Sequence, residues 1–352
     1  MPDHGRGQKV KILYIMGPTR SGSTLLARLL NEYRGVVSVG EVVSIDVALQ
    51  SCRMQARSRG DARSTFVPND AAGGASRRFS ALCGCALPLQ DCPVWGPIEK
   101  SVFGDPPDYS PWSWDAARPG LVRFLLEGSG RWVERNGRAL GEVAESVYRE
   151  LARLTQARII VDDSKTPLYG YFLRHQPWAD VLPVRLVRDP RGTAASWSRA
   201  KPYAGIDGGH LPAHAAHTCS VDWLKRVALA DRLFKASPVV RYEDFIASPM
   251  QIASRLLDAT GVEVEPPDRD HAGAVRLSTN HILASNPDKF ERGTLSIKPP
   301  DWSKVLRTRA RLVVTASTLP LLRRYGYALW DGPEHRSPPF RELVRRGSER
   351  GG

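Results

Sequence analysis

The segment Gly17–Thr24 has the glycines, hydroxyls and single basic residue of a loop that binds an anion. It follows a short apolar run, Lys11–Met16, and opens a stretch with helical periodicity, Ser23–Tyr33. Backbone N–H groups at such a strand–loop–helix junction, together with the positive end of the helix dipole, favour a bound phosphate or sulfate. We therefore expect an anion site here, and a Gly/Ser turn without a ligand is the alternative.

This loop departs from an ATP-binding P-loop at one position. The pattern G-x-x-x-x-G-K-[ST] places a lysine where this sequence has Ser23, and the only basic residue of the loop is Arg20. Because that lysine contacts the β- and γ-phosphates of ATP, its absence weakens an ATP-binding interpretation. One arginine beside a helix N-terminus suits a smaller anion.

Arg188 and Ser196 form a second candidate anion site. Arg188 follows the apolar run Val181–Val187, and Ser196 lies eight residues further on, inside a predicted helix over 190–199. Ligands of open α/β sheets bind beyond the carboxyl ends of the strands, and an arginine and a hydroxyl can share one phosphate there. A buried pair of arginine and carboxylate is the alternative.

The elements that must position these residues are apolar runs that alternate with helical stretches. After Lys11–Met16 the expected strands are 36–39, 158–161, 181–187 and 239–241, and a further helix is expected over 249–260. This alternation predicts an α/β fold, a doubly wound parallel sheet of about five strands flanked by helices. Residues 1–330 are expected to form one domain, and 331–352 a poorly ordered tail.

The segment from about 51 to 141 breaks this alternation because it is rich in Gly, Pro, Ser and Trp. It predicts a long, mostly helical or irregular insertion between the second and third strands, which either shapes an acceptor site or elaborates the surface. Its residues Trp95, Trp112 and Trp114 could stack on an acceptor ring, but at least one is expected in the core.

Composition limits the classes of partner. The formal net charge is +13, from 50 Lys and Arg against 37 Asp and Glu, which attracts phosphorylated molecules, although an arginine-rich composition is an equal explanation. No recognition-helix or zinc-finger pattern is present, so no nucleic-acid partner is expected. No apolar run approaches a membrane span and no signal-peptide pattern is present, so a cytoplasmic protein is expected. The sequence does not indicate an oligomeric state.

Four motifs in this order resemble those of sulfotransferases that use 3′-phosphoadenosine 5′-phosphosulfate (PAPS). Residues 18–24 resemble the 5′-phosphosulfate loop, and Arg188 with Ser196 resembles the 3′-phosphate motif, including its spacing. Residues 240–249 resemble a further motif of the family, and residues 285–302 resemble a pattern of many bacterial members. The resemblance extends from about 11 to 306 outside the insertion. It implies transfer of a sulfuryl group from PAPS to a hydroxyl or amine of a carbohydrate, lipid or small-molecule acceptor, with release of PAP and no required metal.

The resemblance also implies roles for single residues. The 5′-phosphosulfate would be held by Arg20, Ser21, Gly22, Ser23 and Thr24, with Arg20 opposite the leaving-group charge. The 3′-phosphate would be held by Arg188 and Ser196, and Tyr242 would lie near the nucleotide. A loop with Lys289, Arg292 and Gly293 would close over the 3′-phosphate side.

The catalytic base has to come from outside the motif used by the cytosolic branch. Residues 163–167 resemble that branch's Lys-Thr-His motif, but Pro167 stands in place of the histidine. Other branches use a glutamate after the second strand, and Glu41 occupies that position here, so Glu41 is the expected base. A carboxylate that balances a helix dipole is the alternative role for it. His281 is the second candidate, and Lys165 is expected to orient the acceptor or touch the sulfate.

Three of the five cysteines, Cys83, Cys85 and Cys92, cluster in the insertion. A structural zinc site needs four ligands, so Cys52 or a histidine would have to complete one. A disulfide or free thiols are the alternatives, and we predict no metal site from the sequence alone.

Two other functions fit parts of the sequence. Ile159–Asp163 resembles a Walker B strand, which would suit an ATP-dependent kinase of a small metabolite. A non-catalytic nucleotide-binding module would keep Arg188 and Ser196 but would not need Glu41.

Overall fold

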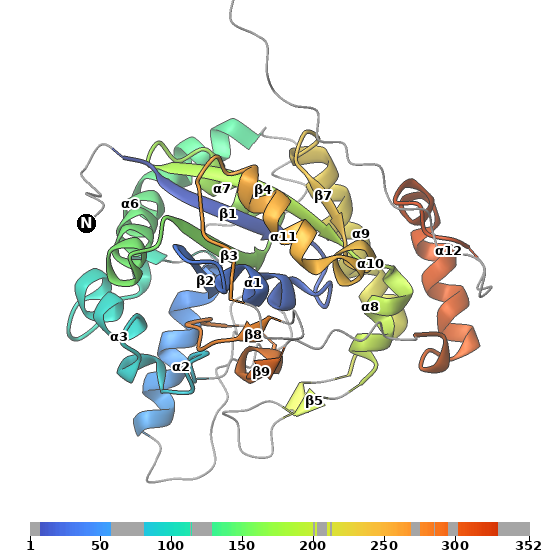
Figure 1. Ribbon diagram of the computed structural model, residues 1–352, viewed down its shortest axis with the longest axis horizontal. Helices are drawn as coiled ribbons and strands as arrows, with labels where there is room; N and C mark the ends of the chain where they lie inside the picture. Colours follow the sequence, from blue (N-terminus) through green and yellow to red (C-terminus); the bar gives the residue numbers. More distant parts are fainter. Residues whose placement is uncertain are drawn as a thin grey trace, which may run out of the picture.

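Five parallel strands form the central sheet, in the order β2-β3-β1-β4-β7 (Figure 1). They are β1 (Val10–Met16), β2 (Val36–Gly40), β3 (Ile159–Lys165), β4 (Ala179–Val187) and β7 (Val239–Arg241). The computed structural model describes residues 8–57, 81–112, 114, 129–199, 201–202, 210–211, 213–268, 275–284, 286–294 and 302–329. The predicted α/β class with a parallel five-stranded sheet is confirmed.

Helices cover both faces of this sheet, as the alternation along β1 requires. Ile12 and Tyr14 pack in one buried cluster with residues of α6 (Ser129–Thr155) and α7 (Pro167–Arg174). Leu13 and Ile15 pack in a second cluster, with α1 (Ser23–Asn31) and α11 (Pro249–Asp258). Successive side chains of a strand point to opposite faces, so a strand that is apolar over five consecutive residues, as β1 is from Ile12 to Met16, needs a cover on each side.

The remaining helices pack beside the sheet or follow its strands. These are α2 (Ile45–Arg57), α3 (Trp95–Ile98), α8 (Pro190–Trp197), α9 (Ala216–Leu233), α10 (Tyr242–Ala247) and α12 (Thr308–Arg324). Short 3-10 turns span Val42–Ser44, Leu89–Asp91, Ser110–Trp112, Pro287–Phe290 and Trp302–Lys304, and a π-helical turn spans Glu99–Phe103. In Figure 1, α8 and α12 lie on the β7 side of the sheet, far from α2 and α3.

Two antiparallel pairs lie outside the sheet. One joins β5 (Lys201–Pro202) to β6 (His210–Leu211), and the other joins β8 (Arg276–Leu277) to β9 (Gly293–Thr294). The second pair brings together the two ends of the segment 278–292, so that this segment forms a loop. In the view of Figure 1, β8 and β9 lie below α1.

The predicted insertion, 51–141, contains more helix than its composition suggests. Its described part includes most of α2, all of α3 and the first half of α6, which continues to Thr155. Trp95, Trp112 and Trp114 are buried at 0%, 0% and 4% exposure and belong to the same cluster as α6 and α7. All three are therefore core residues, and none is free to stack on an acceptor.

No helix within the described ranges is long and apolar enough to cross a membrane. The predicted tail, residues 331–352, lies outside the described residues, as do Ser285 and Asp301 of the sequence motifs.

Candidate active site

The loop Gly17–Gly22 joins β1 to α1, as the sequence predicts. Gly22 adopts φ +93°, and a Cβ there would lie 2.4 Å from a ring carbon of Tyr242, so no larger residue fits. The hydroxyl of Ser21 is buried and has no hydrogen-bond partner among the residues that the structure describes. The first N–H groups of a helix also lack partners within that helix. The loop thus presents donors that an anion would satisfy.

Both predicted anion sites open into one cavity of about 310 Å³. From the loop and α1 it is lined by Arg20, Gly22 and Thr24, and from the segments after β4 and β7 by Arg188, Ser196 and Tyr242. The guanidinium of Arg188 lies 4.2 Å from the centroid of the Tyr242 ring, and its Nη1 donates to the carbonyl of Arg20 at 2.9 Å. The carboxyl ends of three strands therefore meet at this cavity. Ser21 and Ser23 lie in the same loop but do not line it.

The lining also includes polar and aromatic residues to which the sequence gave no role, namely Arg199, Asn286, Asp288 and Trp302. Arg199 lies two residues beyond the end of α8, and the predicted helix over 190–199 would have placed it on the same side as Ser196. Asn286 accepts a hydrogen bond from the guanidinium of Arg20 across 266 residues of sequence. No spacing rule predicts such a contact.

A charged cluster lies beside the loop at the carboxyl ends of β2 and β3. The ammonium of Lys165 is 2.6 Å from Oε1 of Glu41 and 3.4 Å from Oδ2 of Asp163, and that Oδ2 accepts a hydrogen bond of 2.9 Å from the hydroxyl of Ser23. Burial alone would lower the pKa of Lys165, but the two carboxylates raise it above its ordinary value. Burial raises the pKa of Asp163, although the nearby charge of Lys165 acts to lower it. Lys165 is therefore a buried cation held between two carboxylates.

Glu41 is positioned by a tight turn at the end of β2. Gly40 has φ +82°, and a Cβ there would lie 2.9 Å from the carbonyl oxygen of Ala284. The backbone N–H of Glu41 donates to that same oxygen at 3.2 Å. Although Glu41 precedes the turn Val42–Ser44, its side chain makes no capping hydrogen bond and pairs with Lys165 instead. Its side chain is 26% exposed, which leaves the carboxylate accessible.

The other aspartate of β3, Asp162, has a different environment. It is fully buried, and its carboxylate accepts hydrogen bonds from the hydroxyl of Tyr148 on α6 and from the backbone N–H of Ser164. Burial raises the pKa of Asp162 to about 7. Of the two neighbouring aspartates, only Asp163 contacts the loop.

Three residues predicted to close over the 3′-phosphate side do not line the cavity. Lys289 is fully buried, and its ammonium donates to the carbonyls of Leu82 and Leu283 at 2.7 and 2.6 Å. Burial lowers the pKa of Lys289 to about 8. Arg292 donates to the carbonyl of Gly84, and Gly293 begins β9. Lys289 and Arg292 thus connect the loop 278–292 to the insertion.

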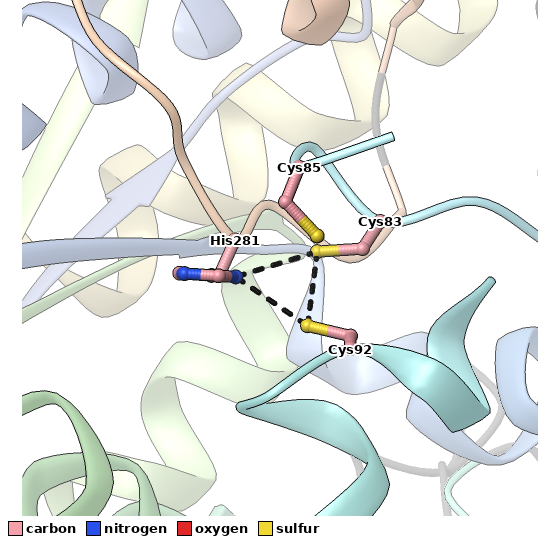
Figure 2. Close-up of side chains that lie close together, drawn as sticks. All are labelled: Cys83, Cys85, Cys92 and His281. Carbon is pink, nitrogen blue, oxygen red and sulfur yellow. Dashed lines mark hydrogen bonds between the residues drawn. The ribbon is translucent and has the colours of Figure 1, made fainter. Parts of the chain in front are cut away.

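His281, the second candidate for the base, also lies outside the lining of the cavity. Its Nδ1 is 3.4 Å from the sulfur of Cys92 and 3.8 Å from that of Cys83 (Figure 2). The hydrogen bond to Cys92 raises the pKa of His281. Hydrogen bonding with Cys83 in turn lowers the pKa of Cys92 to about 4. The histidine therefore belongs to the cysteine cluster, a contact that the sequence did not predict.

Two of the solved structures that resemble this chain are sulfotransferase domains. The sulfotransferase domain from the curacin biosynthetic pathway has 15% identity and a TM-score of 0.44, covering 92% of this chain and all of that one. The sulfotransferase domain from the Synechococcus PCC 7002 olefin synthase has 15% identity and a TM-score of 0.43, covering 93% of this chain and 98% of that one. No protein-family model and no curated protein matches the sequence. At such low similarity, function has to be inferred from the site itself.

Proposed function

We propose that this protein is an enzyme that transfers a sulfuryl group from PAPS to a hydroxyl or amine of a carbohydrate, lipid or small-molecule acceptor and releases PAP. The observation that carries the proposal is the convergence of two cationic sites, 168 residues apart in sequence, on one cavity. A donor with a phosphate at its 3′ position and a charged group at its 5′ position needs two such sites. ATP, whose phosphates form one chain, needs only one.

The residues of the cavity fit PAPS. Arg188 and Ser196 would bind the 3′-phosphate, since a guanidinium and a hydroxyl offer charge-assisted and neutral hydrogen bonds to one phosphate. The loop and the N-terminus of α1 would bind the 5′-phosphosulfate, through Arg20, Thr24 and the backbone N–H groups at the start of the helix. The ring of Tyr242, beside Arg188, offers a surface for the nucleotide. A volume of about 310 Å³ lies at the lower end of the range for ligand pockets.

The chemistry assigned to the chain is positioning, proton removal and charge stabilisation. When bound, PAPS would supply the sulfuryl group, and the acceptor would form a new S–O or S–N bond as the bond to the bridging oxygen breaks. Glu41 would take the acceptor proton as general base, and Lys165 would hold its carboxylate in place. Arg20 and the N-terminus of α1 would stabilise the negative charge that develops on the leaving 5′-phosphate.

An ATP-dependent kinase is the second candidate, and one contact favours it. The hydrogen bond between Ser23 and Asp163 is of the kind that a Walker B aspartate makes with a P-loop. However, the ammonium of Lys165 already lies 3.4 Å from the same carboxylate oxygen, where a magnesium ion would need to approach. Position 23 also lacks the lysine that contacts the ATP phosphates. The kinase is therefore not favoured.

A thermal-shift titration tests the proposal, with PAP in one series and ATP plus magnesium in the other. A ligand at 100 times its dissociation constant stabilises the folded state by roughly 2.7 kcal/mol, which gives a readily measured shift. We expect PAP to raise the melting temperature and ATP with magnesium to leave it unchanged. A shift with ATP and magnesium alone would overturn the proposal in favour of the kinase. A shift with PAP, but no PAP release from PAPS with any acceptor, would indicate a non-catalytic module.

A further inference from the structure

Three cysteines and one histidine come together from segments that are far apart in the sequence. Cys83, Cys85 and Cys92 belong to the insertion, and His281 lies some 190 residues later. Each offers one ligand atom, and these four atoms all lie within 4.8 Å of one another. Figure 2 shows the side chains of all four directed into one small region. In the sequence alone the cluster has only three members, one ligand too few for a structural zinc site.

Three of the four atoms have the spacing of ligands around one metal ion, and the sulfur of Cys85 lies within 4.8 Å of each of them. The sulfurs of Cys83 and Cys92 are 3.4 Å apart, and Nδ1 of His281 lies 3.4 and 3.8 Å from them. A tetrahedral zinc ion with Zn–S of about 2.3 Å and Zn–N of about 2.0–2.1 Å separates its ligand atoms by about 3.6–3.8 Å. A disulfide would require the two sulfurs to be about 2.05 Å apart.

Hydrogen bonds from neighbouring groups hold the backbone and one of the sulfurs of the cluster in place. Cys83 closes a turn in which its N–H donates to the carbonyl of Leu87 at 2.8 Å. The sulfur of Cys92 accepts from the backbone N–H of Val94 at 3.5 Å. The carbonyl of His281 accepts from the indole N–H of the buried Trp95 at 2.7 Å. The four side chains are therefore presented together by the fold, and outer hydrogen bonds of this kind orient metal ligands in proteins.

We propose that Cys83, Cys85, Cys92 and His281 bind one structural zinc ion, through three thiolates and Nδ1 of the imidazole. Thiolate-rich ligand sets select zinc over magnesium and calcium, which prefer oxygen. Four protein ligands leave no open coordination position, so the ion holds structure and does not bind a substrate.

The site joins the insertion to the segment that supports Glu41. Next to His281, the carbonyl of Ile282 accepts from the N–H of Gly84 at 2.9 Å, and the N–H of Leu283 donates to the carbonyl of Val39 at 2.9 Å. One residue further, Ala284 accepts from the N–H of Glu41. The ion thus fixes the strand-like segment 281–284 against the end of β2. The zinc site itself does not depend on the proposed function. Its effect on Glu41 matters for catalysis only if the proposed function is correct.

Metal analysis of the full chain tests the proposal directly. The protein is purified without a metal-affinity step and its zinc content is measured by elemental mass spectrometry. We expect about one zinc per wild-type chain, and a loss of at least tenfold in Cys92→Ser. Cys219→Ser is the matched control, because Cys219 is a buried cysteine outside the cluster, and it should keep its zinc.

Two further measurements do not depend on the folding of a variant. Wild-type protein reloaded with cobalt should show the thiolate charge-transfer and visible bands of tetrahedral cobalt. Mass spectrometry of the native protein should find no bond between Cys83 and Cys92. Wild-type protein without zinc, zinc retained in Cys92→Ser, or a Cys83–Cys92 disulfide would each overturn the proposal. PAP binding, measured in parallel by thermal shift, tests the proposed function separately, so that either can fail alone.

Discussion

Lys165 is the residue on which the charged part of the candidate site depends. Its ammonium is buried, and its charge is compensated by Glu41 at 2.6 Å and Asp163 at 3.4 Å. Removing one partner from a buried ion pair is costly because it leaves a charge without compensation. Glu41 therefore has two roles in this account, as partner of Lys165 and as proposed base, and an experiment has to separate them.

Substitution Glu41→Gln removes the proposed base and leaves Asp163 as the carboxylate that compensates Lys165. The amide keeps the shape and can still accept a hydrogen bond from Lys165, but it cannot take a proton. We expect PAP release from PAPS, with an acceptor that supports turnover, to fall roughly 10²–10⁴-fold while PAP affinity stays unchanged. The control is Glu142→Gln, an exposed glutamate on α6, which should behave as wild type. Full turnover in Glu41→Gln would exclude Glu41 as the base.

The buried carboxyl of Asp162 predicts a pH dependence of stability. Its folded pKa is raised to about 7 by burial, against an ordinary value of 3.8. Between these values the folded state holds a proton that the unfolded state has lost, so stability falls as the pH rises through this window. The contribution of Asp162 to the free energy of unfolding should fall by up to about 4 kcal/mol from pH 4 to pH 7. Urea unfolding of wild type and Asp162→Asn across this range measures it, and parallel pH curves for the two proteins would contradict it.

At the scale of elements, the turn after β2 controls where Glu41 lies. Gly40→Ala adds a Cβ at φ +82°, 2.9 Å from a backbone oxygen, whereas Gly261→Ala adds one at φ +71° with nothing within 4 Å. Positive φ costs an alanine about 1–3 kcal/mol at either position. We expect Gly40→Ala to lose more stability than Gly261→Ala in denaturant titrations, and to lose turnover as well. Equal losses of stability, or unchanged turnover in Gly40→Ala, would show that contact with Ala284 does not position Glu41.

Most of the sheet could be predicted from the sequence because its strands are short apolar runs. β3 is instructive because it continues past Val161 to Lys165 through polar residues. Asp162 and Asp163 are tolerated in a buried strand because Tyr148 and Ser23 supply their hydrogen bonds. Those partners lie elsewhere in the chain, so the local pattern ends the strand too early. The start of α6 was likewise hidden by the composition of the insertion.

The candidate site could be predicted only where it is local. The loop after β1, and Arg188 with Ser196 after β4, are each short segments whose spacing carries the signal. The contacts of Asn286 with Arg20 and of His281 with Cys92 join residues that are 266 and 189 positions apart. They depend on the path of the loop 278–292, which has little regular structure and hence no periodicity to detect.

Over the whole molecule, every strand of the sheet delivers a side chain to the same edge. The residues that follow or end the five strands are Glu41 after β2, Lys165 at the end of β3, Arg20 in the loop after β1, Arg188 after β4 and Tyr242 after β7. Ligands of open α/β sheets bind at the carboxyl ends of the strands, and here the cationic groups and the candidate base gather there. The sheet therefore explains why short motifs spread along the chain end at the same edge of the molecule.

The measurement that tests this account most directly is a calorimetric comparison of PAP with AMP, which lacks the 3′-phosphate. Wild-type protein should bind PAP about 10–100-fold more tightly than AMP, as expected for charge-assisted hydrogen bonds to one phosphate. Arg188→Ala should bind the two nucleotides about equally, while Arg174→Ala, an exposed arginine at the end of α7, should keep the preference. Equal binding by wild type, or a preference that survives in Arg188→Ala, would contradict the assignment of the cavity to a 3′-phosphorylated donor.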